Sequence, residues 1–196
     1  MFFLLYFLPL SVNAYIPDEV PAFSAQKLAP GQLLIASDTI STGIFKQSVI
    51  LLTKHDQSGT VGLIINRPST LPLKEVIPEW VADNKAASLF VGGPVHQGVM
   101  SVLLQSQDEP KGLTRIMPMV FHKLGINNEN IGKLISPANT VVRFYSGYAG
   151  WTKGQLASEI NTGGWYVIDA NPRTLFVMDL DSMWQDLIQK AGGKYK

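Results

Sequence analysis

The sequence predicts an α+β fold: a compact single domain, built mostly on an antiparallel β-sheet that is partly barrel-like, with a few flanking helices. Short, strongly apolar runs recur from residue 32 onward, separated by glycine, proline or polar turns. Few segments show helical spacing, and most connections are short enough for hairpins, which favours antiparallel pairing. Because no repeat, low-complexity tract or linker divides the 196 residues, we expect one core.

The first strands are expected at residues 32–37, 48–53 and 61–65. Polar residues 54–59, which end in a glycine, join the second strand to the third and predict a hairpin. All three runs are apolar at consecutive rather than alternate positions. We therefore expect both faces of this part of the sheet to be covered.

The middle of the chain predicts a short helix at 73–77 and a further pair of strands at 89–91 and 99–104. Residues 106–139 are weakly patterned, apart from a short helix near 129–134. This stretch is therefore expected to contribute little regular structure.

The last third predicts alternating elements: strands at 140–145 and 165–168, and helices at about 153–160 and 181–190. Thr152 and Gln155 have the spacing of a capping box, which marks the start of the first helix. The glycine-rich residues between the first strand and this helix are expected to form a turn.

Residues 1–14 have the pattern of a cleavable signal peptide, with ten apolar residues followed by small Val12 and Ala14. The run is too short to span a bilayer, so no transmembrane span is expected in the mature chain. Residues 15–30 predict an irregular lead-in to a domain at 31–196. We therefore expect a periplasmic or secreted protein. Because no Lys or Arg precedes Lys27, a cytoplasmic location is the alternative.

Composition argues against nucleic-acid binding and excludes cysteine chemistry. Sixteen Lys and Arg residues face fifteen Asp and Glu residues, which leaves a net charge of +1 and no basic stripe for nucleic acid. The chain has no cysteine, which excludes disulfides and thiolate metal sites. We predict no cofactor.

The sequence contains no recognisable catalytic set or metal-binding set. Ser146 lies in a glycine-rich segment, but Phe144 stands where a nucleophile elbow requires glycine. The three histidines, His55, His96 and His122, lack metal-ligand spacing, so no metal site is predicted. We expect His122 to be a surface or capping residue.

Two groups of side chains remain as binding candidates. Arg67 follows an apolar strand beside Asn66, where its guanidinium either clamps an anion or locks the corner by binding loop carbonyls. Tyr145, Tyr148 and Trp151 form the densest aromatic cluster, which either stacks a ligand or packs in the core.

Three motifs in a fixed order carry a family resemblance. They read GLIINRP at 62–68, GGPV at 92–95 and GYAGWTKGQL at 147–156. With GQLLIA at 31–36 and the late Trp165, the chain from Gly31 to Ile188 resembles the AlgH/YqgE family of bacterial proteins, whose function is largely unassigned.

The resemblance implies a compact α+β fold with a largely antiparallel sheet, and it carries the loose label of a regulator. It implies no reaction, cofactor or catalytic residue. The motif positions alone transfer, as candidate ligand- or partner-binding residues: Asn66, Arg67, Gly92, Gly93, Tyr148, Gly150 and Trp151.

We favour a non-enzymatic binding or regulatory module for a small anionic ligand or a protein partner. Two alternatives remain open. One is a hydrolase-like enzyme that uses His55, Asp56 and Ser146, and the other is a cytoplasmic transcriptional regulator.

Overall fold

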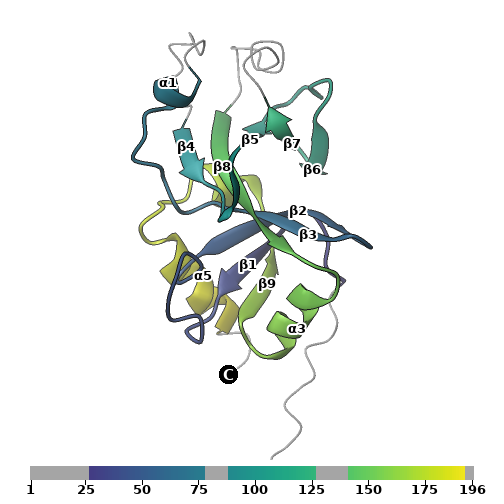
Figure 1. Cartoon of the computed structure of the whole chain (residues 1–196), viewed down its shortest axis with the longest axis vertical. Coiled ribbons are helices and arrows are strands. Elements are labelled where there is room, and N and C mark those ends of the chain that lie inside the picture. Colours follow the sequence, from purple (N-terminus) through teal and green to yellow (C-terminus); the bar gives the residue numbers. More distant parts are fainter. Residues whose placement is uncertain (1–26, 78–87, 127–140, 193–196) are drawn as a thin grey trace, which may run out of the picture.

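The computed structural model describes residues 27–77, 88–126 and 141–192, which form a curled sheet with helices on both of its faces (Figure 1). Its strands are β1 (Gln32–Ala36), β2 (Val49–Asp56), β3 (Gly59–Ile64), β4 (Ser88–Val91), β5 (Val95–Gln105), β6 (Thr114–Met117), β7 (Val120–Ile126), β8 (Val141–Trp151) and β9 (Trp165–Asp169). The helices within these ranges are α1 (Leu73–Val76), α3 (Gln155–Asn161), α4 (Pro172–Phe176) and α5 (Met183–Gly192). The predicted α+β class and mostly antiparallel, partly barrel-like sheet are confirmed.

The long strand β8 connects the two halves of the sheet. The strand order is β6-β7-β5-β8-β3-β2-β1-β9, and β4 also pairs with β8. The first half of β8 lies between β4 and β5, whereas its last residues pair with β3. Gly147 separates the halves at a φ of 70°, which favours glycine and lets the strand change direction.

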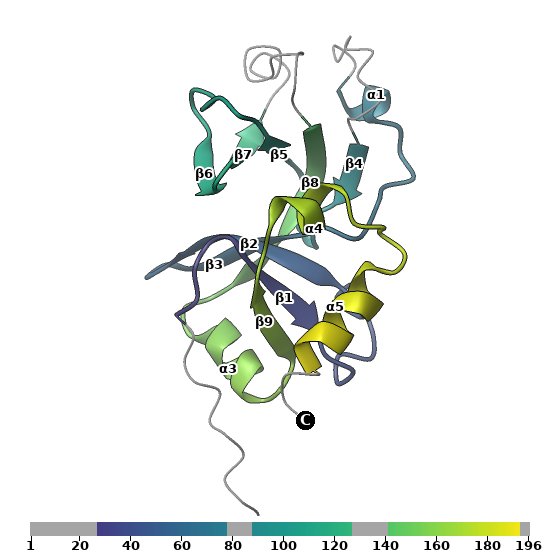
Figure 2. The same cartoon turned by 180° about the vertical axis from the view of Figure 1, so that it is seen from behind.

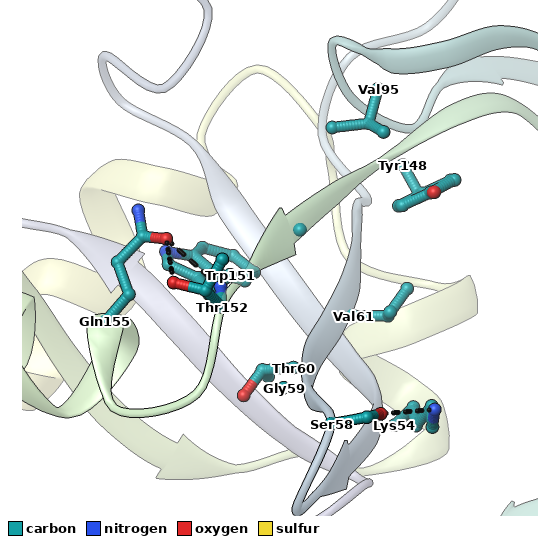
Figure 3. Close-up of a pocket in the computed structure, with 11 residues that line it drawn as sticks. Lys54, Ser58, Gly59, Thr60, Val61, Val95, Tyr148, Trp151, Thr152 and Gln155 are labelled. Carbon is teal, nitrogen blue, oxygen red and sulfur yellow. Dashed lines mark hydrogen bonds between the residues drawn. The ribbon is translucent and has the colours of Figure 1, made fainter.

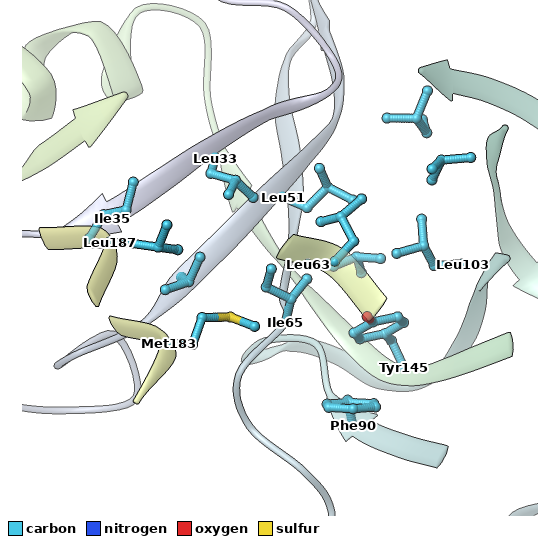
Figure 4. Packing of buried hydrophobic residues seen from close by; sticks show 14 residues of the cluster. Leu33, Ile35, Leu51, Leu63, Ile65, Phe90, Leu103, Tyr145, Met183 and Leu187 are labelled. Carbon is cyan, nitrogen blue, oxygen red and sulfur yellow. The ribbon is translucent and has the colours of Figure 1, made fainter. Parts of the chain in front are cut away.

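One face of strands β1 to β3 packs against α5. Leu33, Leu51 and Leu63 are cross-strand partners with no exposed surface, and they belong to the same cluster as Met183 and Leu187 of α5 (Figure 4). Both α5 residues are buried, one helical turn apart. Figure 2 shows α4 and α5 together on this side of the sheet.

The opposite face of the same strands packs against α3. Leu34, Ile50 and Ile64 form a second buried cluster with Leu156 and Ile160 of that helix. The expectation that both faces are covered is therefore confirmed. The consecutive apolar residues of these strands are buried on both sides, each contributing roughly 1.5–3 kcal/mol to folding.

Two predicted connections are wrong. The strands at 89–91 and 99–104 do not pair with each other, because β4 runs parallel to β8 and β5 runs antiparallel to it on its other side. The glycine-rich segment that follows Tyr145 is not a turn, since β8 continues through it to Trp151. Gly154, in the left-handed conformation, makes the turn and precedes α3.

The sequence did not predict β6 and β7, which lie in the weakly patterned stretch at 106–139, because their apolar residues are too few to indicate strands. Helix α4 was also missed, although Asn171 caps it and Pro172 opens it, a recognisable start signal. The helix expected near 129–134, the signal peptide at 1–14 and most of the lead-in at 15–30 lie outside the described residues. Within the described ranges, no helix has the length and apolarity needed to cross a bilayer.

Candidate functional site

The three sequence motifs meet at Gly92. Its amide N–H donates to the carbonyl of Ser146 at 2.8 Å, and its carbonyl accepts from Ile64 N–H at 2.9 Å. One residue earlier, Val91 N–H donates to the carbonyl of Arg67 at 2.9 Å. The motif at 92–95 therefore lies between the end of β3 and the middle of β8, and it connects the two halves of the sheet.

Asn66 locks the corner that follows β3. The side chain is 6% exposed. Its Oδ1 accepts from Val49 N–H, and its Nδ2 donates to the carbonyl of Gln47, both at 2.9 Å. Arg67 is half-buried, and its Nη2 donates to the carbonyl of Lys46. Both side chains therefore bind the loop that leads into β2, as the structural interpretation of this corner expected.

Asn66→Ala is expected to destabilise the protein by about 2–4 kcal/mol, because it leaves the buried N–H of Val49 and a loop carbonyl without partners. Urea unfolding followed by tryptophan fluorescence measures the change. The control is Asn161→Ala at the exposed end of α3, for which we expect less than about 0.5 kcal/mol. Equal effects of the two substitutions would contradict this role for Asn66.

Tyr148, Gly150 and Trp151 line an open pocket of about 320 Å³ between β3 and β8, which we call the β8 pocket (Figure 3). Its other lining residues are Lys54, Ser58, Gly59, Thr60, Val61, Val95, Thr152 and Gln155. Asn66, Arg67, Gly92 and Gly93 are not among them. The predicted candidates thus fall into two groups. Asn66, Arg67, Gly92 and Gly93 lie at the junction between the two halves of the sheet, whereas Tyr148, Gly150 and Trp151 line the pocket.

The Tyr148 ring is held beside the pocket by His96 of β5. The two rings are 5.8 Å apart in an edge-to-face arrangement, and the Tyr148 hydroxyl lies 3.3 Å from His96 Nδ1. Gly150 has no side chain to cover the ring, since a Cβ added there would lie 3.5 Å from Tyr148 Cε2. The tyrosine face therefore stays accessible from the pocket.

Trp151 lines the pocket, but most of its side chain is buried in the core. It is 6% exposed and lies 6.4 Å from Phe45 and 6.0 Å from Trp165, measured between ring centroids. The indole N–H groups of Trp151 and Trp165 donate to the same oxygen of Glu159, at 2.9 and 2.8 Å. Trp151 is thus separated from Tyr145, which packs on Phe90 in another cluster, and Tyr148 packs against that same cluster.

The residues of the hydrolase alternative are not joined. His55 Nδ1 lies 2.8 Å from Thr60 Oγ1, whereas the Ser146 hydroxyl donates to the carbonyl of Gln97. Asp56 accepts hydrogen bonds from Ser58, and these hold the pKa of its carboxyl at about 2. Among the described residues no hydrogen bond links His55, Asp56 and Ser146, so a relay between them is not assembled.

No group of three or more metal-ligating side chains occurs in residues 27–77, 88–126 and 141–192. The expectation that His122 lies at the surface is wrong: it is 7% exposed, and burial lowers its pKa to about 4. In the β7 register His122 faces Leu103 of the neighbouring strand, which places it inside the curled sheet. A histidine in the midst of an apolar strand was the available signal.

Sequence reasoning also missed a set of buried polar atoms. Ser101 Oγ, His122 Nε2, Arg143 Nη1 and Tyr145 OH are all covered and have no hydrogen-bond partner. Each belongs to a polar side chain that interrupts an apolar strand. The four residues lie on three strands, β5, β7 and β8, of which β5 and β8 were predicted from the sequence. Burial raises the pKa of the Tyr145 hydroxyl to about 12, against the opposing effect of the neighbouring Arg143 guanidinium.

Comparisons with known proteins confirm the resemblance. The model of the AlgH-like family matches residues 33–196. A UPF0301 protein of Chlorobium luteolum is 33% identical over 174 residues, covering 87% of this chain and 90% of the relative. A UPF0301 protein of Mycobacterium tuberculosis is 30% identical over 177 residues, with 89% and 88% covered.

Two solved structures share the fold. A crystal structure of a Corynebacterium diphtheriae protein has a TM-score of 0.67 and 30% identity, covering 84% of this chain and 87% of that one. The solution structure of the Pseudomonas aeruginosa AlgH protein has a TM-score of 0.64 and 26% identity, covering 83% and 88%. The curled sheet is thus common to these proteins.

Proposed function

We propose that this chain, which belongs to the AlgH-like family, is a non-enzymatic binding module that recognises a small ligand with an acidic group in the β8 pocket. The observation that carries this proposal is the pocket itself, whose volume of about 320 Å³ lies in the range of small-molecule sites. It contains three of the candidate positions that the sequence motifs single out.

The pocket offers apolar surface for the body of a ligand. Val61 and Val95 lie on either side of the Tyr148 ring (Figure 3). All three side chains are partly exposed, so the pocket retains apolar area that a ligand would remove from water. A planar group placed over Tyr148 would add stacking to this burial.

Lys54 supplies the charge that favours an acidic group. Its Nζ lies 3.1 Å from Asp56 Oδ2 and 3.0 Å from Ser58 Oγ. Both ions are about half exposed, with side-chain exposures of 53% and 47%. Because an exposed ion pair contributes only about 0–1 kcal/mol, a ligand anion can compete with Asp56 for Lys54.

Gly150→Val should abolish binding in the β8 pocket while preserving the fold. Gly150 lies in a strand, its φ is compatible with a side chain, and a Cβ there makes only ordinary contacts, with Tyr148 and Val95. The probes are benzoate, benzamide and benzylamine, followed by amide chemical-shift changes in NMR spectra. We expect benzoate to shift Thr60, Val61 and Tyr148 most, and Gly150→Val to remove these shifts.

Two further variants complete that experiment. Lys54→Gln should make benzoate no stronger than benzamide, because only the charged contact is lost. Ala157→Val also introduces a valine, on the exposed side of α3, and should change nothing. Shifts that are strongest for benzylamine, or that map away from β3 and β8, would contradict the proposal.

A further inference from the structure

Four polar side chains lie on one face of the half of the sheet that is formed by β4 to β8. Ser101 of β5 is directly opposite Tyr145 of β8, two residues from Arg143 on the same strand. Leu103 of β5 pairs with Arg143 on one side and with His122 of β7 on the other. Since paired and alternate residues share a face, these side chains gather around Leu103.

All four side chains are buried. Ser101 and Tyr145 have no exposed surface, and His122 and Arg143 are 7% and 8% exposed. Each has at least one polar atom, named above, that is covered and lacks a hydrogen-bond partner. Buried polar atoms are nearly always paired, so four orphaned atoms on one face require an explanation.

Arg143 differs from the other three residues because its charge is permanent. A guanidinium cannot shed its proton to escape burial, as a buried lysine or histidine can. The two salt bridges within the described residues are Lys54–Asp56 and Arg115–Glu109, so Arg143 has no carboxylate partner there.

The surroundings of Arg143 do not compensate its charge. Its guanidinium carbon lies 4.9 Å from the ring centre of Phe90 and 5.7 Å from that of Phe176 in α4. Figure 4 shows Phe90 and Tyr145 side by side at this end of the core. Ring faces attract a cation, but they do not neutralise it, and Nη1 of the guanidinium stays without a hydrogen-bond partner.

We propose that Arg143, Ser101, His122 and Tyr145 form a binding site for one small oxyanion, a carboxylate or a phosphate. The planar guanidinium matches such an anion with two parallel N–H donors. The hydroxyls of Ser101 and Tyr145 donate further hydrogen bonds to it, and His122 Nε2 donates one in the matching tautomer. A single ligand would thereby satisfy all four orphaned atoms and balance the buried charge.

This site is separate from the β8 pocket and does not rest on the function proposed for it. The four residues do not line that pocket. Because their polar atoms are covered, the anion enters by local displacement of a packed group. Of the two rings beside the guanidinium, Phe90 is buried, whereas Phe176 is only partly buried and belongs to a five-residue helix, so Phe176 is the group that moves.

Thermal unfolding of the whole purified protein tests the site, with sodium phosphate or sodium acetate compared against sodium chloride at matched ionic strength. An anion that binds only the folded state raises the midpoint, by about 5–10 °C at one hundred times its Kd. We expect this rise in the wild type for phosphate or acetate, and the larger rise identifies the preferred anion.

Arg143→Met keeps most of the side-chain volume and removes the charge, so it should abolish the rise. Arg115→Met is the matched control: Arg115 is exposed and lies over Phe121, and its replacement should leave the rise intact. Tyr145→Phe removes a single donor and should reduce the rise, which keeps the test decisive if Arg143→Met fails to fold.

The proposal is overturned if neither anion raises the wild-type midpoint above the chloride value. It is also overturned if Tyr145→Phe and Arg143→Met respond as the wild type does. NMR offers an independent readout, because an anion bound at Arg143 should shift the guanidinium Nε–H resonance of that residue and not that of Arg115.

Discussion

Gly93→Ala is expected to destabilise the protein by about 4 kcal/mol, a large part of the roughly 5–15 kcal/mol that stabilises an ordinary domain. A Cβ at Gly93 would lie 2.2 Å from the carbonyl carbon of Tyr148 and 2.4 Å from the amide nitrogen of Ala149. Both atoms belong to the backbone of β8, so no side chain can move to make room. The φ of 157° adds strain for any residue with a Cβ.

Gly98→Ala is the matched control, because Gly98 lies in β5, five residues after Gly93. A Cβ at Gly98 meets nothing within 4 Å, so its replacement should change stability by less than about 1 kcal/mol. Urea unfolding followed by tryptophan fluorescence compares the two variants. If Gly93→Ala unfolds at the wild-type urea concentration, the backbone contact between the second motif and β8 does not hold the halves together.

The sheet interior was predictable where local pattern and burial agree. Strands β1 to β3 are apolar at consecutive positions and covered on both faces, so any reading of the pattern places them in the core. The partners of β4 were not predictable in the same way. Its four residues pair with a strand more than fifty positions later, and only the close backbone approach at Gly92 reveals why.

The candidate sites were likewise predictable only in part. Tyr148 and Gly150 were identified from their motif, but Lys54, Val61 and Val95 come from separate segments that no local pattern links to it. The glycines at 147 and 150 were expected to end a strand. Instead, Gly147 bends β8 and Gly150 leaves the Tyr148 ring uncovered.

Buried polar side chains were overlooked because polar residues are normally assigned to the surface. Arg143 interrupts two valines and two aromatic residues in β8, and a strand buried on both faces has no outward side for it. Charge inside such a strand is therefore a signal for a paired or ligand-binding group. The same reasoning applies to His122, whose burial has a measurable consequence for stability.

The stability of the protein is expected to fall by about 3 kcal/mol more than in a His122→Leu variant as the pH is lowered from 7 to 4. Burial lowers the pKa of His122 from 6.5 to about 4 in the folded protein, while the unfolded chain keeps the higher value. Below pH 6.5 the unfolded state therefore binds a proton more readily than the folded state does. The contribution of His122 is complete above pH 6.5 and is lost as the pH falls toward 4.

Urea unfolding at half-unit steps between pH 7.5 and 4, in chloride buffers, measures this difference. His122→Leu removes the titrating group from the core, so its stability should depend less on pH in this window than that of the wild type. His96→Gln, which replaces an exposed histidine, is the comparison variant. The hydrogen bonds of Asp56 do not interfere, because the wild type and His122→Leu both keep them and their effect on stability is lost mainly between pH 3.8 and about 2, below the window. Parallel curves for the wild type and His122→Leu would show that the imidazole is not held neutral, and the cluster around Arg143 would then be open to water.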